Sequence, residues 1–310
     1  MCSGPGYLSL PLRNLSLLPL LASIPLHSAS GQTGGLEEAL RARIGSDTAV
    51  VAVAYYDGVT GDTLLIDGLR RYHAASTMKV PVLIELARRV EKGEFRWEDS
   101  LPVRNAFRSI ADSSEFRLDP TDDSDSSLYA ELENRVAIER LARLMIARSS
   151  NLATNLLIEL LGPTRVDATA HLLGADSLTV LRGVEDGKAY ERGLNNTTTA
   201  RDLAQLLDAI SRDRAASHSQ CQIMLNFLLA QEFNDGIPAG LPHGVKVAHK
   251  TGEITAVAHD AAIVFPPDRG PYILVILTRG YADRTAAARL MADLSELVYH
   301  WATRKPEPHE

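Results

Sequence analysis

Apolar residues follow strand patterns near the two ends of the chain and helical spacing in the middle. A short helix is predicted over 36–44, and an apolar, β-rich run, AVVAVAYY, occupies 49–56. A second strand is predicted over 63–66. Because the residues between the two strands include DG at 57–58 and TGD at 60–62, which are typical of turns, the strands are expected to form a hairpin.

Helical spacing dominates the middle of the chain. Helices are predicted over 78–92, 137–147, 152–161, 199–210 and 220–229. The third of these is expected to end at Gly162-Pro163. After Gly244 the strand pattern returns, over 245–249, 259–265 and 272–277, and a final helix is predicted over 283–301.

This order of elements predicts an α+β fold. Two early strands and three late ones are expected to form one five-stranded antiparallel sheet flanked by the terminal helices. The sheet subdomain should cover about 36–75 and 243–303, and an inserted all-helical subdomain about 76–242. Because ligand sites form where such units meet, the cleft between them is the expected site.

The N-terminal 30 residues have a different composition from the rest. They hold no acid and one base, Arg13, followed by an apolar run over 15–26 and small residues at 28–30. This pattern is typical of a secretory signal peptide, so we expect export to the periplasm or the medium and a catalytic domain over 31–310. The alternatives are an N-terminal anchor or a start codon placed too far upstream. The run is short and broken by prolines, so no stable membrane insertion is expected after cleavage.

Composition narrows the class of protein. The 310 residues are 45% hydrophobic and 23% charged, which is typical of a soluble globular chain with one large domain or two small ones. The net charge of −7 gives no reason to expect nucleic-acid binding. Cys2 lies in the leader and leaves Cys221 alone, so neither an internal disulfide nor a cysteine metal cluster is expected. We expect no metal or other cofactor, and a monomer.

An acidic stretch over 112–131 carries seven acids against one base, Arg117. We expect it to be a solvated surface excursion. The alternative is a calcium loop, for which the spacing and the glycine of an EF-hand are absent. Its oxygen ligands would come from Asp119, Asp122, Asp123 and Asp125.

Three short motifs carry candidate chemistry. In Ser76-Thr77-Met78-Lys79, a serine and a lysine lie three residues apart, on one face of a predicted helix. A serine hydroxyl becomes a strong nucleophile only when a base takes its proton, and a lysine with a lowered pKa can be that base. The alternative is an N-cap serine beside a surface lysine.

The other two motifs are Ser149-Ser150-Asn151, between two predicted helices, and Lys250-Thr251-Gly252, at the end of the strand over 245–249. In the second, a lysine and a hydroxyl could bind a carboxylate, and a glycine lets another backbone approach closely. The alternatives are a capped helix junction and an ordinary strand end with a glycine turn.

The three motifs together resemble the S-x-x-K, S-D-N and K-T-G set of class A serine β-lactamases and penicillin-binding proteins, in the same order and contexts. The resemblance covers nearly all of 36–301. It implies that Ser76 is the acylated nucleophile, Lys79 its proton acceptor and Ser149 the relay to the leaving nitrogen. It further implies substrate binding by Asn151, Lys250, Thr251 and Gly252, and an oxyanion hole made by the amides of Ser76 and Glu253.

The chain departs from the family pattern in three places. Ser150 stands where class A enzymes carry aspartate, and the interval from Ser76 to Ser149 is long. The Ω-loop, which in the family holds a glutamate that activates the deacylating water, is shortened. Glu185 follows an arginine as the family residue does, and is our preferred base. Glu191 matches the E-x-x-L-N spacing of the family and is the alternative.

The resemblance implies a serine hydrolase that opens β-lactam amides through an acyl-enzyme on Ser76. One alternative is a penicillin-binding DD-peptidase or esterase with the same nucleophile and slow deacylation. Another is a non-catalytic protein that binds cell-wall peptides. The expected partner is a small β-lactam or a cell-wall peptide.

Overall fold

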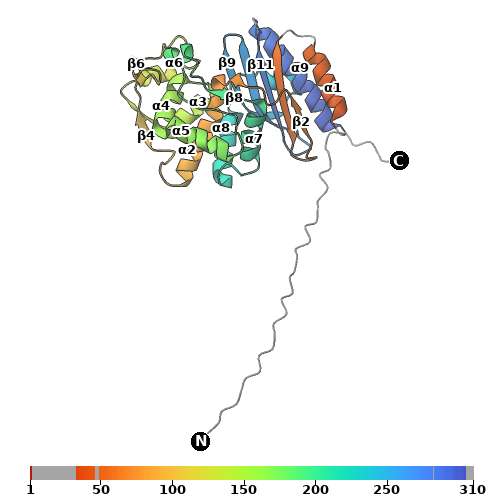
Figure 1. Ribbon diagram of the computed structural model, residues 1–310, viewed down its shortest axis with the longest axis horizontal. Coiled ribbons are helices and arrows are strands. Elements are labelled where there is room, and N and C mark those ends of the chain that lie inside the picture. The colour runs from red at the N-terminus through yellow and green to blue at the C-terminus, as the bar shows by residue number, and fades with distance from the viewer. Residues whose placement is uncertain (2–32, 46–48, 282, 305–310) are drawn as a thin grey trace, which may run out of the picture.

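The computed structural model describes residues 33–45, 49–281 and 283–304, together with Met1, so the predicted signal peptide lies outside the described residues. Figure 1 shows a sheet packed beside a group of helices, with two further helices on the far face of the sheet. The predicted α+β fold is therefore confirmed. No helix among the described residues is long and apolar enough to span a membrane.

The sheet has five antiparallel strands from both ends of the described chain, in the order β2-β1-β11-β10-β9. β1 pairs with β11 from Val50 opposite Arg279 to Asp57 opposite Tyr272. The strands are β1 (Val50–Asp57), β2 (Thr63–Ile66), β9 (Lys246–Ile254), β10 (Val257–Phe265) and β11 (Tyr272–Arg279). Their central members read as continuous apolar runs because both faces of the sheet are covered.

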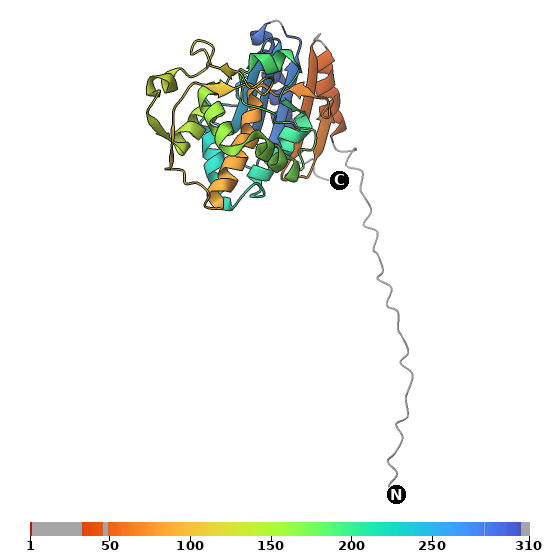
Figure 2. The same ribbon diagram turned by 60° about the vertical axis from the view of Figure 1, so that its left-hand side comes forward.

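The terminal helices α1 (Gly34–Gly45) and α9 (Arg284–Thr303) pack together on one face of the sheet. Their apolar residues, including Leu40 and Leu294, form one core with the outward face of β1 and β11. A larger core fills the space between the other face and the remaining helices. In Figure 2 those helices come forward and the strands lie behind them.

The helical part is built around α2, in which every residue from Lys79 to Ala87 is buried. The helices are α2 (Lys79–Glu91), α3 (Ile138–Ala147), α4 (Asn151–Leu161), α5 (Pro163–Leu172), α6 (Gly187–Glu191), α7 (Ala200–Ser211) and α8 (His218–Leu229). α7 contacts both β1 and β11, and α8 contacts β9. These helices therefore bring the loops between them to the edge strand β9.

Short elements complete the fold. The described residues include the 3-10 turns η2 (Ala75–Met78), η3 (Ser127–Glu131) and η4 (Ile237–Gly240). Three two-stranded ladders pair β3 (Tyr72–His73) with β8 (Thr197–Thr198), β4 (Ser100–Pro102) with β7 (Arg135–Ala137), and β5 (Phe107–Arg108) with β6 (Glu115–Phe116). Strands of two or three residues are too short to leave a periodic pattern, which is why the sequence did not predict these ladders.

One local prediction was wrong, and a second was confirmed but missed an adjoining helix. The strand predicted over 245–249 continues to Ile254, so Lys250-Thr251-Gly252 lies inside β9 and not after its end. Gly162-Pro163 ends α4 as predicted, but it also starts α5: Gly162 adopts φ 80°, and Pro163 occupies the first turn of the next helix. A proline at that position costs nothing, because the missing N–H would have had no partner within the helix.

Candidate active site

All three motifs meet in one cleft between the helical part and β9. Ser76 and Lys79 come from η2 and the start of α2, Ser149 and Asn151 from the junction of α3 and α4, and Lys250 from β9. The two adjoining hollows of this cleft share Ser76, Ser124 and Glu253 in their walls. Segments separated by as many as 101 residues are in hydrogen-bond contact here.

Ser76 is half-buried in the 3-10 turn that precedes α2. The residue before it, Ala75, adopts the left-handed conformation with φ 46°, and its amide donates to Nδ1 of His73 at 3.0 Å. Non-glycine residues seldom adopt this conformation, and such strain gathers at functional sites. The helix predicted over 78–92 is thus preceded by a tighter turn, which holds Ser76.

Gly252 allows β9 to approach the backbone of that turn. A Cβ atom at residue 252 would lie 3.0 Å from the amide nitrogen of Thr77 and 3.2 Å from that of Ser76. Any side chain would therefore push β9 away from the serine. The geometry gives a physical reason for a glycine at this position.

Lys79 is fully buried, and its ammonium nitrogen is surrounded by oxygen atoms of the S-S-N junction. Nζ donates to the carbonyl of Ser149 at 2.6 Å, to Oγ of Ser149 at 3.1 Å and to Oδ1 of Asn151 at 2.9 Å. Burial lowers the pKa of Lys79 to about 7, against the opposing charges of Asp123 and Glu185. A lysine with this pKa is substantially neutral near neutral pH and is able to accept a proton.

Ser149 stands at the centre of the cleft in a left-handed conformation, with φ 58°. The next residue, Ser150, caps α4 by accepting from the amide of Ala153 at 3.3 Å. The capping alternative thus describes Ser150, whereas Ser149 and Asn151 face Lys79. The motif therefore caps α4 and also places two side chains against Lys79.

Lys250 is also fully buried, and its Nζ donates to Oγ of Ser149 at 3.1 Å and to the carbonyl of Thr251 at 2.9 Å. Burial, and then the nearby charge of Lys79, lower the pKa of Lys250 well below its ordinary value, while Asp260 opposes the shift. Thr251 is half-buried and lines the same hollow. Burial and the charge of Lys79 therefore both disfavour the ammonium form of Lys250.

The two candidate Ω-loop glutamates lie in different places. Glu185 lines the cleft, and its Oε1 accepts from Nδ2 of Asn151 at 3.3 Å. Partial desolvation, with the charges of Asp122 and Asp123, raises its pKa, although much of the side chain faces solvent. Glu191 is the exposed last residue of α6 and is not among the residues that line the cleft.

The side chain of Glu253 makes a contact that the sequence did not indicate. Its Oε2 lies 2.9 Å from Nε of Arg284, and Asp235 lies 3.1 Å from Nη2 of the same arginine. All three residues line one end of the cleft. The expectation for Glu253 concerned only its backbone amide, and Arg284 at the start of α9 carried no motif that could have marked it.

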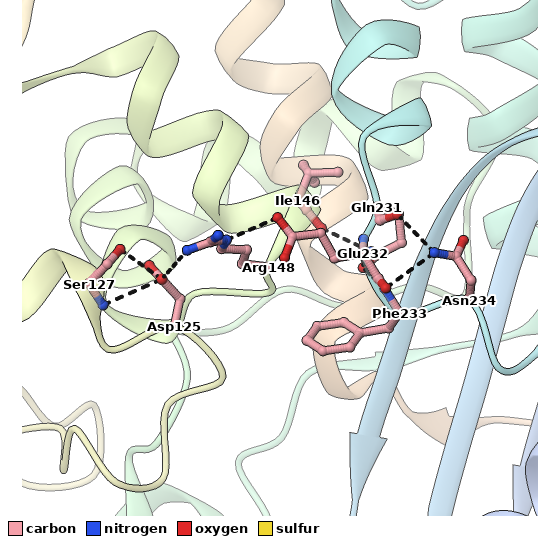
Figure 3. Close-up of polar contacts among 8 residues, drawn as sticks. All are labelled: Asp125, Ser127, Ile146, Arg148, Gln231, Glu232, Phe233 and Asn234. Atoms are coloured by element: carbon pink, nitrogen blue, oxygen red, sulfur yellow. Dashed lines mark hydrogen bonds and ion pairs between the residues drawn. The ribbon is translucent and has the colours of Figure 1, made fainter.

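The acidic stretch is more than a solvated excursion, so that prediction was wrong in part. Asp125 and Leu128 are buried, and Ser124 lines the cleft. Figure 3 shows how the stretch is held: Arg148 lies between Oδ1 of Asp125, at 3.3 Å, and Oε1 of Glu232, at 3.0 Å. The burial of apolar residues such as Leu128 requires the chain to fold back onto the protein.

Arg148 thereby connects the acidic stretch to the loop after α8. In that loop, Gln231 donates to the carbonyl of Ile146 at 2.9 Å and accepts from the amide of Phe233 at 3.1 Å. Phe233 lines the cleft. The acidic stretch and the loop after α8 both line this end of the cleft. Both are therefore hydrogen-bonded to the segment that ends in Ser149.

Within the described ranges, no group of three or more histidine, cysteine, aspartate or glutamate residues is arranged to hold a metal ion. Three of the four acids considered for a calcium loop, Asp119, Asp123 and Asp125, accept hydrogen bonds from protein groups. Asp119 accepts from the amide of Thr121 at 2.9 Å, and Asp123 from the amide of Asn151, also at 2.9 Å.

Comparisons with known proteins agree with this geometry. The extended-spectrum beta-lactamase PER-1 of Pseudomonas aeruginosa is 22% identical over 297 residues, which cover 92% of this chain and 93% of that protein. A beta-lactamase from Sphaerobacter thermophilus superposes with a TM-score of 0.76 at 26% identity, over 88% of this chain and 99% of that one. A variant of PBP-A, solved as an acyl-enzyme complex with penicillin G, superposes with a TM-score of 0.73 at 26% identity, over 86% and 95%.

A family model described as the beta-lactamase enzyme family matches residues 35–302. The match covers both parts of the fold and every residue of the cleft named above. The chain belongs to the beta-lactamase enzyme family.

Proposed function

We propose that the protein is a serine hydrolase that opens the amide bond of β-lactams through a covalent acyl-enzyme on Ser76. The observation that carries the proposal is the fully buried Lys79, whose pKa of about 7 suits a proton acceptor. Lys79 lies three residues after the half-buried Ser76. The chain belongs to the beta-lactamase enzyme family. A surface lysine, with an ordinary pKa above 10, could not serve this purpose near neutral pH.

Acylation is proposed to proceed through a tetrahedral intermediate. Oγ of Ser76 attacks the lactam carbonyl carbon while neutral Lys79 takes the hydroxyl proton. The amides of Ser76 and Glu253 stabilise the oxyanion. The C–N bond then breaks, and the ring nitrogen receives a proton from Oγ of Ser149, which Lys79 replaces. The products of this half-reaction are an ester on Ser76 and a secondary amine.

Substrate binding is proposed to use Lys250, Thr251 and Asn151. A carboxylate on the substrate would accept from Nζ of Lys250 and the hydroxyl of Thr251. The amide of Asn151 would bind the substrate's side-chain amide. Because an adjacent anion favours the charged lysine, binding would restore the proton that burial disfavours on Lys250.

Deacylation is proposed to use Glu185 as the general base for a water molecule. Its position in the cleft wall and its contact with Asn151 support this assignment over Glu191. A carboxylate with a raised pKa is a stronger base than an ordinary one. Export of the protein, which would place it where β-lactams act, is supported by the composition of residues 1–30.

The second candidate is a penicillin-binding protein that acylates in the same way and deacylates slowly. It is favoured by one observation: much of the Glu185 side chain faces solvent. The likeness to the PBP-A variant, whose penicillin acyl-enzyme was solved, is compatible with this candidate.

The lifetime of the penicillin adduct decides between these functions. We expect intact-mass spectrometry to show one equivalent of drug attached to the protein within seconds, followed by its loss as the ester hydrolyses. Ser76→Ala should form no adduct. An adduct in Ser76→Ala would overturn the assignment of the nucleophile, and a stable adduct on the unmodified protein would favour the penicillin-binding candidate.

A further inference from the structure

Asp123, in the acidic stretch, contacts the beginning of the helix that carries the second motif. Its Oδ1 accepts from the amide of Asn151 and its Oδ2 from the amide of Leu152, each at 2.9 Å. Tyr129 donates to the same carboxylate at 3.0 Å. One side chain therefore binds the first two backbone amides of α4 and is itself held in place by the stretch it comes from.

These hydrogen bonds act on a residue that touches Lys79. Asp123 accepts a hydrogen bond from the backbone amide of Asn151. The side-chain Oδ1 of the same asparagine lies 2.9 Å from Nζ of Lys79. Ser150, the central residue of the motif, caps only the amide of Ala153. The carboxylate at this helix start thus comes from a different loop, some 28 residues earlier in the chain.

The charge of Asp123 also affects Lys79. The charged groups that face Lys79 are Asp123, Glu185 and Lys250. Among the two acids, Asp123 has the larger effect, and its negative charge raises the pKa of Lys79 against the effect of burial. Asp123 therefore influences Lys79 both through Asn151 and through its own charge.

We propose that Asp123 is a positioning residue of the active site, which holds Asn151 against Lys79 and thereby sets the geometry of the acylation base. This inference rests on the proposed function and adds to it a residue outside all three motifs. The acidic stretch then has a purpose in the cleft, as the support of the S-S-N junction.

The test compares Asp123→Asn with Asp119→Asn, which alters an exposed acid of the same stretch that lacks contact with α4 in the described structure. Acylation is followed by intact mass under single-turnover conditions from pH 5 to 9. We expect Asp123→Asn to acylate about 10–100-fold more slowly on its plateau, because small displacements of catalytic groups have effects of that size. Asp119→Asn should match the unmodified protein.

The pH profile separates positioning from mere capping of a helix. Loss of the Asp123 charge removes an influence that raises the pKa of Lys79, so the acidic limb of the acylation profile should move to lower pH. A simple cap would lower the melting temperature and leave this limb in place. That result, or an unchanged acylation rate, would overturn the inference.

Asp123→Glu provides a second variant that keeps the charge but displaces it. This variant should acylate slowly, but the acidic limb of its pH profile should lie near that of the unmodified protein. If both Asp123→Glu and Asp123→Asn acylate at the normal rate, the positioning role is refuted. If the unmodified protein forms no adduct, the proposed function fails by itself. The titration of Lys79, followed by NMR of lysine-labelled protein, then tests the inference without substrate, and an unshifted titration in Asp123→Asn overturns it.

Discussion

The ammonium nitrogens of Lys79 and Lys250 lie at equal distances, 3.1 Å, from the same atom, Oγ of Ser149. A hydroxyl oxygen has two lone pairs and one proton, so both lysines can donate to it while its own proton points elsewhere. Two ammonium groups this close repel each other, and burial adds to the cost of charging them. Ser149 thus stands where a proton can pass between a lysine and a leaving group.

The pKa of Lys79 predicts how acylation responds to pH. If neutral Lys79 is the base, the acylation rate should rise about tenfold per pH unit below pH 7 and level off above it, because the deprotonated fraction of Lys79 increases through its pKa of about 7. Stopped-flow measurements with a chromogenic cephalosporin would follow this. An acylation rate that stays constant from pH 5 to 8 would exclude Lys79 as the base.

The lowered pKa of Lys250 predicts that anionic substrates bind together with a proton. In Ser76→Ala, which cannot acylate, penicillin binding should be accompanied by proton uptake, because the pKa of Lys250 is lowered and the bound carboxylate favours its ammonium form. Calorimetry in buffers of different ionisation enthalpy measures this uptake. Lys250→Gln should lose it, and a penicillin methyl ester should show little. Uptake that persists in Lys250→Gln would assign the proton to another group.

The position of Glu185 in the cleft predicts which glutamate supports turnover. Glu185→Gln should acylate normally and then stall after one equivalent, with steady-state turnover lowered about 10²–10⁴-fold, the usual contribution of a general base. Glu191→Gln, on the exposed end of α6, should turn over almost normally. Burst kinetics compare the two variants directly. Exchanged results would identify Glu191 as the base, and two normal variants would exclude both.

The contact between Glu253 and Arg284 predicts a limit on the affinity for anionic substrates. Glu253→Gln removes one of the two carboxylates that pair with Arg284 and leaves Asp235 at 3.1 Å, so the guanidinium keeps less of its charge balanced and attracts a substrate carboxylate more strongly. We expect KM for penicillins to fall severalfold with kcat little changed. Glu296→Gln, an exposed acid on the same helix as Arg284, serves as the control. An unchanged KM would show that Arg284 does not reach the substrate.

The contact between Arg148 and Asp125 predicts an effect on stability. Asp125 is buried, so Arg148→Gln would leave its carboxylate without its cation and should lower the free energy of unfolding by about 1–3 kcal/mol. Arg140→Gln breaks a surface pair with Glu131 and should lower it by less than about 1 kcal/mol. Urea titrations compare the two, and equal losses would mean that burial of Asp125 is of no consequence.

The sequence predicted those parts of the molecule that have a repeating pattern. The five strands and the helices α1, α2, α3, α4, α7, α8 and α9 follow apolar periodicity, and their order predicts the sheet. Ser76, Lys79, Ser149 and Lys250 were singled out because each motif is a short stretch of fixed spacing in the sequence. Long-range contacts through single side chains leave no such pattern, which is why Asp123, Arg148 and Arg284 were missed.

The pairing of β1 with β11 has a consequence for how the protein is made. Val50 in β1 lies opposite Arg279, so the sheet cannot close until the chain through β11 has left the ribosome. Before that moment β1 has only its hairpin partner β2, and an isolated hairpin is marginally stable in water. Such distant pairing slows folding. A chain that ends before β11 would therefore lack the central strand of the sheet, and β1 could not join β10 and β9.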